Sequence, residues 1–347
     1  MYCKDLFKHE SGATRGRKGN NLMKFLITGG TGSLGKALAK RLLSLGHEIV
    51  IYSRDEGKQA LTYKSSRTSK LHCVIGDIRD FDKLNVTFAQ HKPDYVIHTA
   101  ALKRIDDMEF HPDECIKTNI TGSENVAKAS LLNGVKKCIL ISTDKACQPV
   151  NVYGSSKFIA ERIFTNYDYM SGDTVFSSVR YGNVIASRGS FIPLWISMIE
   201  KDQPLMVTSL EMTRFLFTLE DAVNTVLNSV EAAEGGEVFI PNISSFDMKT
   251  ILMTLEKHMK KPFTYGVTGL RPGEKLHEDM LAKTELPYTY IVPGDINLLS
   301  VRPQYTNRVH SDTWKKYVGK EFNSSLHVSS YVPQLQDLII RGLLETG

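Results

Sequence analysis

The chain has 347 residues, of which 41% are hydrophobic and 23% are charged, and its formal net charge is +5. These values are ordinary for a soluble globular protein with one large domain or two smaller ones. The charge is too small to predict a nucleic-acid partner, and no apolar run reaches the ~18 residues that a membrane span needs. We therefore expect a cytoplasmic protein with neither a nucleic-acid nor a membrane partner.

Residues 1–22 contain five basic and two acidic side chains and lack the apolar segment of a secretory signal. We interpret them as an N-terminal extension, expected to be disordered. The five cysteines form no C-x-x-C pair, which predicts free thiols in a reducing compartment. The ten histidines show no H-x-H or H-x-x-x-H spacing, so the sequence predicts no metal site.

A glycine-rich turn is the first motif of the chain. The apolar segment 24–28 predicts a buried strand, and a helix is predicted over 34–45. Glycines 29, 32 and 35 form the motif G-x-x-G-x-x-G at the junction of the strand and the helix. Gly29 suits a tight turn, Gly32 lets the backbone approach a pyrophosphate, and Gly35 lets the helix pack on the sheet. We therefore predict that a dinucleotide cofactor binds at Gly29, Thr31, Gly32, Ser33, Leu34 and Gly35.

The end of the second predicted strand, 48–52, indicates which dinucleotide binds. An acid directly at this position would favour a free ribose 2′-hydroxyl. Ser53 and Arg54 instead suit a 2′-phosphate, because both can donate hydrogen bonds to it, and Lys58 adds a second charge. The sequence favours NADP over NAD, with Asp55 as a helix cap. The alternative for Arg54 is a solvated surface charge.

The next predicted strands, 71–76 and 95–99, end in further candidate contacts, and a long helix is predicted over 112–133. Asp77 can accept a hydrogen bond from an adenine amine while Ile78 covers the ring, although a helix cap is the simpler role for this acid alone. After the fourth strand, small residues let the backbone pass close to a nicotinamide ribose, and the contacts expected there are Ala100, Ala101 and Lys103.

The stretch 142–157, S-T-D-K-A-C-Q-P-V-N-V-Y-G-S-S-K, follows a predicted strand at the sheet edge where open α/β folds bind ligands. Tyr153 and Lys157 are four residues apart on a predicted helix and share one face. Beside a nicotinamide they form the tyrosine–lysine pair of short-chain dehydrogenases, in which the ammonium and the cofactor's positive ring lower the pKa of the phenol. The phenolate takes a proton from a sugar hydroxyl as hydride leaves the same carbon, and Thr143 hydrogen-bonds the same oxygen.

Asp144 and Lys145 are groups that a simple oxidoreductase or a 4-epimerase does not need. Oxidation of carbon 4 of a hexose acidifies the hydrogen on carbon 5. A lysine held partly neutral by burial near other cations can remove that hydrogen, and a protonated aspartate can assist loss of the carbon 6 hydroxyl as water. Hydride returned to carbon 6 completes a 4,6-dehydration.

Beyond about residue 184, short elements separated by prolines predict a smaller lobe and not another doubly wound unit. The predicted fold is α/β: a Rossmann-like doubly wound parallel sheet over 23–184, to which some later segments return, and a C-terminal substrate-binding lobe over 185–347. Arg188, Arg214 and Arg271 are spaced like contacts to a substrate diphosphate, whereas each one alone is more simply a surface charge.

Over residues 24–281 the chain resembles the extended short-chain dehydrogenase/reductase family, and within it the soluble UDP-N-acetylglucosamine 4,6-dehydratases that invert carbon 5. The relatives that act on dTDP-glucose or UDP-glucose have Asp-Glu in place of Asp144-Lys145, and large membrane-bound relatives have Met in place of Tyr153. Thr99 departs from the alanine more usual in these relatives. The motifs that carry the resemblance are T-G-G-T-G-S-L-G, Y-S-R-D-E-G-K-Q, H-T-A-A-L-K, S-T-D-K-A, Y-G-S-S-K, R-Y-G-N-V-I-A-S-R-G-S, M-T-R-F and R-P-G-E-K-L-H-E.

The resemblance implies a lyase with NADP as cofactor and UDP-N-acetylglucosamine as substrate, assembled as a dimer or a hexamer. Its expected product is UDP-2-acetamido-2,6-dideoxy-β-L-arabino-hexos-4-ulose. The alternatives are a UDP-sugar 4-epimerase and, from another class, a catalytically silent NADP-binding sensor. The implied catalytic residues are Thr143, Asp144, Lys145, Tyr153 and Lys157, and the implied substrate contacts are Lys103, Asn183, Arg188, Ser190, Arg214, Arg271 and Glu274.

Overall fold

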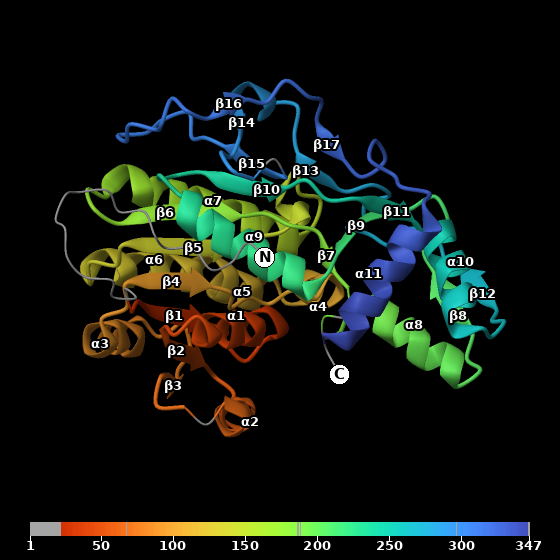
Figure 1. Ribbon diagram of the computed structural model, residues 1–347, viewed down its shortest axis with the longest axis horizontal. Helices are drawn as coiled ribbons and strands as arrows, with labels where there is room; N and C mark the ends of the chain where they lie inside the picture. The colour runs from red at the N-terminus through yellow and green to blue at the C-terminus, as the bar shows by residue number, and fades with distance from the viewer. Residues whose placement is uncertain (1–21, 67, 186, 188, 296, 346–347) are drawn as a thin grey trace.

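Figure 1 shows the computed structural model, which describes residues 22–66, 68–185, 187, 189–295 and 297–345. The predictions made for residues 1–21 and for Arg188 lie outside the described residues. Within these ranges, no helix combines the length and the apolar character of a membrane span.

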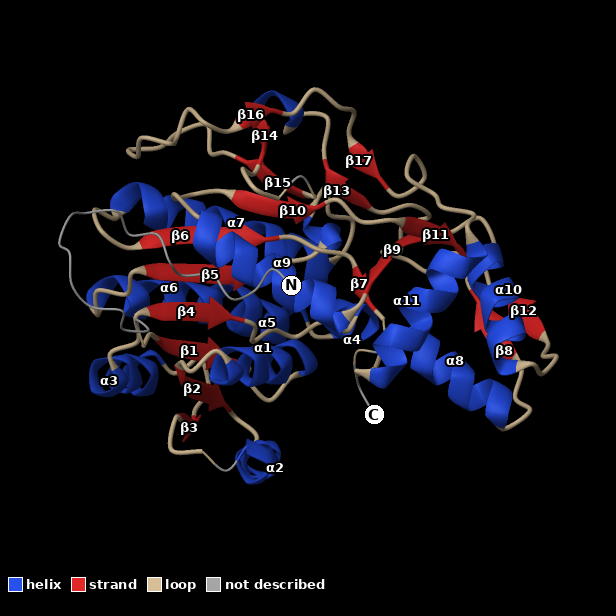
Figure 2. Ribbon diagram, viewed as in Figure 1, coloured by secondary structure: helices blue, strands red, loops and turns tan. Residues whose placement is uncertain are grey.

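A large sheet forms the centre of the molecule (Figure 2), with its strands in the order β16-β14-β15-β10-β6-β5-β4-β1-β2-β3. Strands β3-β2-β1-β4-β5-β6 run parallel in the order of a Rossmann fold, which confirms the predicted doubly wound α/β class. The parallel strands are β1 (Lys24–Thr28), β2 (Glu48–Ser53), β3 (Leu71–Ile75), β4 (Tyr95–His98), β5 (Lys137–Ile141), β6 (Val175–Val179) and β10 (Val238–Pro241). Beyond β10, antiparallel pairing adds β15 (Leu298–Val301), β14 (Thr289–Ile291) and β16 (Lys315–Lys316).

Alternate side chains of the parallel strands point to opposite faces of the sheet, and each face is covered by a layer of helices. Successive strand residues face opposite sides of a sheet. Ile139 and Ile141 of β5 therefore join the core under α1 (Ser33–Ser44) and α9 (Leu219–Ala232). Cys138 and Leu140 face the other core, which is covered by α3 (Phe81–His91), α6 (Gly122–Leu132) and α7 (Val152–Met170). Helix α2 (Glu56–Ser66) connects β2 to β3.

The helix predicted over 112–133 is not uniform. It consists of α5 (Pro112–Cys115), a π-helical turn η1 (Ile116–Thr121) and α6. The π turn contains Asn119, which is fully buried. Its amide bonds the backbone N–H of Leu102 at 2.8 Å, the carbonyl of Leu102 at 2.9 Å and the hydroxyl of Ser156 at 3.0 Å. These bonds satisfy the buried amide and tie the helix to the loop after β4 and to α7.

A third core lies away from the sheet, at the right of Figure 1. Trp195, Phe246, Ile251 and Leu335 are among its buried side chains. The surrounding elements are α8 (Phe191–Glu200), β8 (Leu205–Val207), β9 (Thr213–Phe217), β11 (Ser245–Asp247), α10 (Met248–Met259), β12 (Tyr265–Val267) and α11 (Val332–Leu344). The shorter elements are α4 (Ile105–Phe110), η2 (Asp144–Ala146), β7 (Asn183–Val184), β13 (Asp279–Leu281), η3 (Leu286–Tyr288) and β17 (Phe322–Asn323).

Arg180, which is fully buried at the end of β6, joins the sheet to segments from both halves of the chain. Its guanidinium donates to Glu161 of α7 at 2.7 and 3.1 Å, and to Glu285 at 3.0 Å. It also donates to the carbonyl of Met280 in β13 at 2.8 Å. A buried charge is costly unless it is paired, so these bonds hold α7, β6 and β13 in one arrangement.

Replacing Arg180 with methionine should lower the free energy of unfolding by about 3–5 kcal/mol, because Glu161 would remain buried without its partner. Denaturant-induced unfolding measures this loss. In the control variant Arg341→Met, which breaks a more exposed pair with Asp337, the loss should stay below about 1 kcal/mol. Equal losses in the two variants would contradict the importance of the buried network.

Candidate active site

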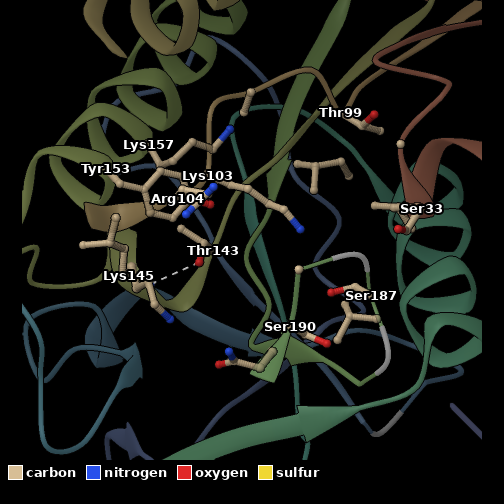
Figure 3. Close-up of a pocket in the computed structure, with 18 of the residues that line it drawn as sticks. Ser33, Thr99, Lys103, Arg104, Thr143, Lys145, Tyr153, Lys157, Ser187 and Ser190 are labelled. Atoms are coloured by element: carbon tan, nitrogen blue, oxygen red, sulfur yellow. Dashed lines mark hydrogen bonds between the residues drawn. The ribbon is translucent and has the colours of Figure 1, made fainter. Parts of the chain in front are cut away.

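A cavity of about 1530 Å³ lies along the carboxyl ends of the parallel strands and continues into the C-terminal lobe. Every predicted cofactor, catalytic and substrate residue that the structure describes lines it. Figure 3 shows Thr143, Lys145, Tyr153 and Lys157 on one side of the pocket, with Ser33 across it. The sequence motifs therefore meet at a single site.

The glycine-rich turn is shaped by close backbone contact. Gly29 has φ +68°, and a Cβ atom there would lie 2.8 Å from the backbone of Ala100, so only glycine fits without strain. Gly32 caps α1 without a side-chain hydrogen bond, so the cap residue does not compete with an anion for the first N–H groups of the helix. The helix start is thus suited to a phosphate.

Two groups at the end of β2 can donate to an anion. Ser53 accepts a hydrogen bond from the Gln59 amide at 2.9 Å and keeps its own hydrogen to donate. Arg54 has an exposed side chain on the cavity lining. As predicted, Asp55 caps α2, because its carboxylate accepts from the backbone N–H of Lys58 at 2.9 Å and also pairs with the Lys58 ammonium.

Asp77 does not cap a helix. Its carboxylate accepts from the backbone N–H of Arg79 at 3.0 Å and from the guanidinium of the same residue at 2.9 Å. These bonds and the nearby Arg54 hold its pKa below the usual range, although burial acts in the opposite direction. The cap of α3 is Asp80, whose carboxylate accepts from the N–H of Lys83.

The turn that carries Asp144 and Lys145 packs directly against α7. A Cβ atom on Gly154 would lie only 2.2 Å from the carbonyl oxygen of Lys145, so the turn and the helix meet where there is no side chain. The N–H of Asp144 donates to the carbonyl of Tyr181 at 2.9 Å and fixes the turn to the end of β6. This contact brings the turn next to Tyr153.

The tyrosine–lysine pair projects from α7 (Figure 3). Burial lowers the pKa of Lys157 to about 8, although Glu161 opposes the shift. Burial raises the pKa of Tyr153 to about 12, while the Lys145 charge and a hydrogen bond with Thr143 act in the opposite direction. The sequence analysis predicts a lowered pKa for the Tyr153 phenol in the site with its cofactor. In this structure the pKa is raised, because burial outweighs the neighbouring positive charge.

Lys145 differs from its prediction. Its ammonium lies 3.0 Å from Asp144 Oδ1 and 3.3 Å from Glu278 Oε1. Burial and Arg214 lower the pKa of Lys145, but the two carboxylates outweigh them and raise it above its usual value. The expectation of a partly neutral amine among cations is therefore wrong in this structure, since the amine lies between two carboxylates.

Glu278 is the site residue that the sequence analysis missed. It is buried on the cavity lining, and its Oε2 atom has no hydrogen-bond partner. The signal was present, because Glu278 ends the motif R-P-G-E-K-L-H-E and lies four residues after Glu274. Buried polar atoms normally have partners, so a group of unpaired ones indicates where a polar ligand binds. The other unpaired buried atoms on the lining are Thr118 Oγ1, Asp144 Oδ2, Asn183 Oδ1 and Ser190 Oγ.

Arg214 and Arg271 occupy different environments. Arg214 is buried and donates to the carbonyls of Thr213 at 2.7 Å and Lys275 at 3.0 Å, so it is not the simple surface charge considered above. It holds the segment that carries the two glutamates in place. The exposed Arg271 pairs with Glu274 at 3.0 Å and with Asp106 of α4 at 3.0 Å, and all three residues line the cavity.

A family model described as polysaccharide biosynthesis protein matches residues 25–294. The chain belongs to this family, within the extended short-chain dehydrogenases/reductases. It is 43% identical over 275 residues to UDP-N-acetylglucosamine 4,6-dehydratase (inverting) of Campylobacter jejuni, covering 78% of this chain and 80% of the relative. It is 40% identical over 268 residues to UDP-glucose 4-epimerase of Rickettsia massiliae, covering 75% and 78%. The solved structure of Pen from Bacillus thuringiensis matches with a TM-score of 0.85 at 32% identity, covering 93% of this chain and 98% of that one.

Lys145 and Lys157 should lose their protons at widely different pH values. NMR of the protein labelled at the lysine side chains, with signals assigned from Lys157→Met and Lys145→Met variants, should give Lys157 a midpoint pH of about 8. Lys145 should stay charged above about pH 10.5, the ordinary lysine range. Two midpoints at that ordinary value would show that neither environment acts as described.

Proposed function

We propose that the protein is an NADP-dependent UDP-N-acetylglucosamine 4,6-dehydratase that inverts carbon 5. The observation that supports this most strongly is the pair formed by the buried Asp144 and the partly buried Lys145 in the same cavity as Tyr153 and Lys157. The tyrosine–lysine pair serves hydride chemistry in general, whereas the acid–amine pair is suited to removing water. The Campylobacter relatives that carry the dehydratase name are consistent with this assignment.

The cofactor residues form a set that suits NADP. Bound NADP supplies the acceptor for the sugar's hydride and later its donor. The start of α1 takes the pyrophosphate, while Ser53, Arg54 and Lys58 take the 2′-phosphate. The carboxylate of Asp55 is already committed to Lys58, so it does not compete for a ribose hydroxyl. The remaining contacts are Asp77 and Ile78 at the adenine, and Ala100, Ala101, Lys103 and Lys157 at the nicotinamide ribose.

The catalytic residues divide the reaction between them. Tyr153, assisted by Thr143, takes the proton of the carbon 4 hydroxyl, which leaves a ketone at that carbon. Lys145 removes the hydrogen of carbon 5, now acidified by the ketone. Asp144 gives a proton to the carbon 6 hydroxyl, which leaves as water, and its unpaired Oδ2 atom is suited to that contact. Inversion follows if the unsaturated sugar turns its other face toward Lys145 before the lysine returns a proton to carbon 5.

The lobe supplies the contacts for UDP. The buried, unpaired atoms of Asn183 and Ser190 suit the polar groups of the nucleotide sugar. Arg271 and Lys103 line the cavity and can pair with the charges of the diphosphate. Arg214 contributes indirectly, because its hydrogen bond to the Lys275 carbonyl holds the segment that carries Glu274. An apolar wall of Phe191, Leu194, Trp195 and Met206 offers a surface for the base.

A UDP-sugar 4-epimerase is the second candidate, because the Rickettsia relatives at 40% identity carry that name. An epimerase needs Tyr153 and Lys157, and it turns the ketone over before hydride returns to carbon 4. It has no use for an acid and an amine at carbons 5 and 6, so the Asp144–Lys145 pair favours dehydration.

Incubation of the NADP-loaded protein with UDP-N-acetylglucosamine should give a product that is lighter by one water molecule, detected by mass spectrometry. Loading with NAD instead should give slower turnover. The Lys145→Ala variant should lose dehydration while its affinity for NADPH changes by less than about twofold, because the lysine acts on the sugar. A product of unchanged mass would support the epimerase, and full dehydration by Lys145→Ala would refute the assigned base.

A further inference from the structure

A connection of five residues, 147–151, joins the turn η2 to helix α7. The Asp144–Lys145 pair lies before it and the tyrosine–lysine pair follows it, so its conformation sets how the two pairs face one another. Within the connection, Gln148 has φ +49°, in the left-handed region that residues other than glycine rarely adopt. Such a conformation costs free energy and persists only where surrounding contacts hold it.

Two hydrogen bonds tie this connection to the motif R-P-G-E-K-L-H-E, one on each side of the strained residue. The Lys275 ammonium donates to the carbonyl of Cys147 at 2.9 Å. The Asn151 amide donates to the carbonyl of Gly273 at 2.7 Å. The side chain of Lys275 is only 15% exposed, so water competes little for its bonds.

Lys275 is itself fixed at both its backbone and its ammonium. Its carbonyl accepts from the Arg214 guanidinium at 3.0 Å. Its ammonium also lies 3.1 Å from Oδ2 of Asp279, whose other carboxylate oxygen accepts from the Asn323 amide at 2.6 Å. A charged donor that is held in this way makes a strong hydrogen bond to the Cys147 carbonyl and keeps that carbonyl in a defined position.

The two ends of the catalytic turn are held by different halves of the chain. The N–H of Asp144 fixes the start of the turn to the end of β6, through the carbonyl of Tyr181 at 2.9 Å. Lys275 fixes the end of the turn from the C-terminal half, through the Cys147 carbonyl. Among the described residues, Lys275 is not part of the cavity lining, so it reaches the turn from outside the site.

We propose that Lys275 is a positioning residue for the elimination, acting through the Cys147 carbonyl and not on the sugar. This inference rests on the proposed dehydration. The bond keeps Gln148 in its left-handed conformation, so that the catalytic turn stays in place against helix α7. Because the same motif carries Arg271 and Glu274, the segment proposed to bind the nucleotide sugar also holds the groups that remove water.

The test is Lys275→Met, which keeps the apolar stem of the side chain and removes its donor. The kcat for dehydration of UDP-N-acetylglucosamine should fall roughly 20-fold, since a displacement of about 1 Å can cost as much as roughly 100-fold. KM and the affinity for NADPH should change by less than about threefold, because Lys275 contacts neither ligand in the proposed site.

A second readout separates elimination from oxidation. Tyr153 and Lys157 lie on helix α7, beyond the connection, so hydride transfer to bound NADP should slow less than the loss of water. Enzyme-bound NADPH should therefore accumulate during turnover by Lys275→Met, to a higher level than in the wild type. Stopped-flow absorbance of the reduced nicotinamide measures this accumulation.

The variant Gln148→Gly tests whether the bond acts through the strained residue. Glycine adopts φ +49° without the cost that a side chain brings, so the connection should depend less on Lys275. Gln148 is exposed, and its replacement disturbs no core packing. In the Gln148→Gly background, Lys275→Met should lower kcat by less than about fivefold, against roughly 20-fold in the wild-type background.

Lys283→Met is the matched control. It makes the same substitution at an exposed lysine eight residues further along the chain. Its kcat should stay within about twofold of the wild type, because surface substitutions away from such contacts have small effects.

Four results would overturn the inference. The first is a wild-type kcat in Lys275→Met, and the second is an equal loss in both Gln148 backgrounds. The third is a loss confined to KM or to NADPH affinity, which would place Lys275 at a ligand. The fourth is slow turnover without accumulation of NADPH, which would show that hydride transfer is the affected step. Absence of dehydration in the wild type itself would instead refute the proposed function.

Discussion

The approach of the Thr143–Lys145 turn to helix α7 is the contact on which the candidate site depends. At Gly154 the carbonyl of Lys145 occupies the space that any side chain would need. Two sets of chemical groups, one on a strand-end turn and one on a helix, therefore face the same cavity. Without this contact, the tyrosine–lysine pair and the aspartate–lysine pair would belong to separate surfaces, and one sugar ring could not meet both.

Buried ionic groups then connect this contact to the rest of the fold. Arg180 fixes α7 through Glu161 and reaches the C-terminal half through Glu285 and the carbonyl of Met280. Two residues before Met280, Glu278 faces Lys145. Charges buried in this way stabilise little by themselves, but removing one partner leaves the other unpaired at a large cost. The network thus specifies how the lobe sits against the turn.

Much of the fold was predictable because it depends on local patterns. The apolar runs at 24–28 and 137–141 predicted both ends of β1 and of β5 correctly. The glycine-rich turn and the Tyr153–Lys157 pair, both found from their spacing, line the cavity. The direction of the Lys145 pKa was not predicted, because it depends on the contact with the adjacent Asp144 carboxylate and on Glu278, which is far away in the sequence. The burial of Arg214 and the π turn at Asn119 also arise from tertiary contacts that no local pattern encodes.

The central claim is that Asp144 and Lys145 remove water across carbons 5 and 6 after oxidation at carbon 4. Turnover of UDP-N-acetylglucosamine in deuterated water, followed by proton NMR, tests it most directly. The account predicts a 6-deoxy-4-keto sugar that carries deuterium at carbon 5, in the inverted configuration. A product epimerised at carbon 4, with its original hydrogen still on carbon 5, would contradict the account.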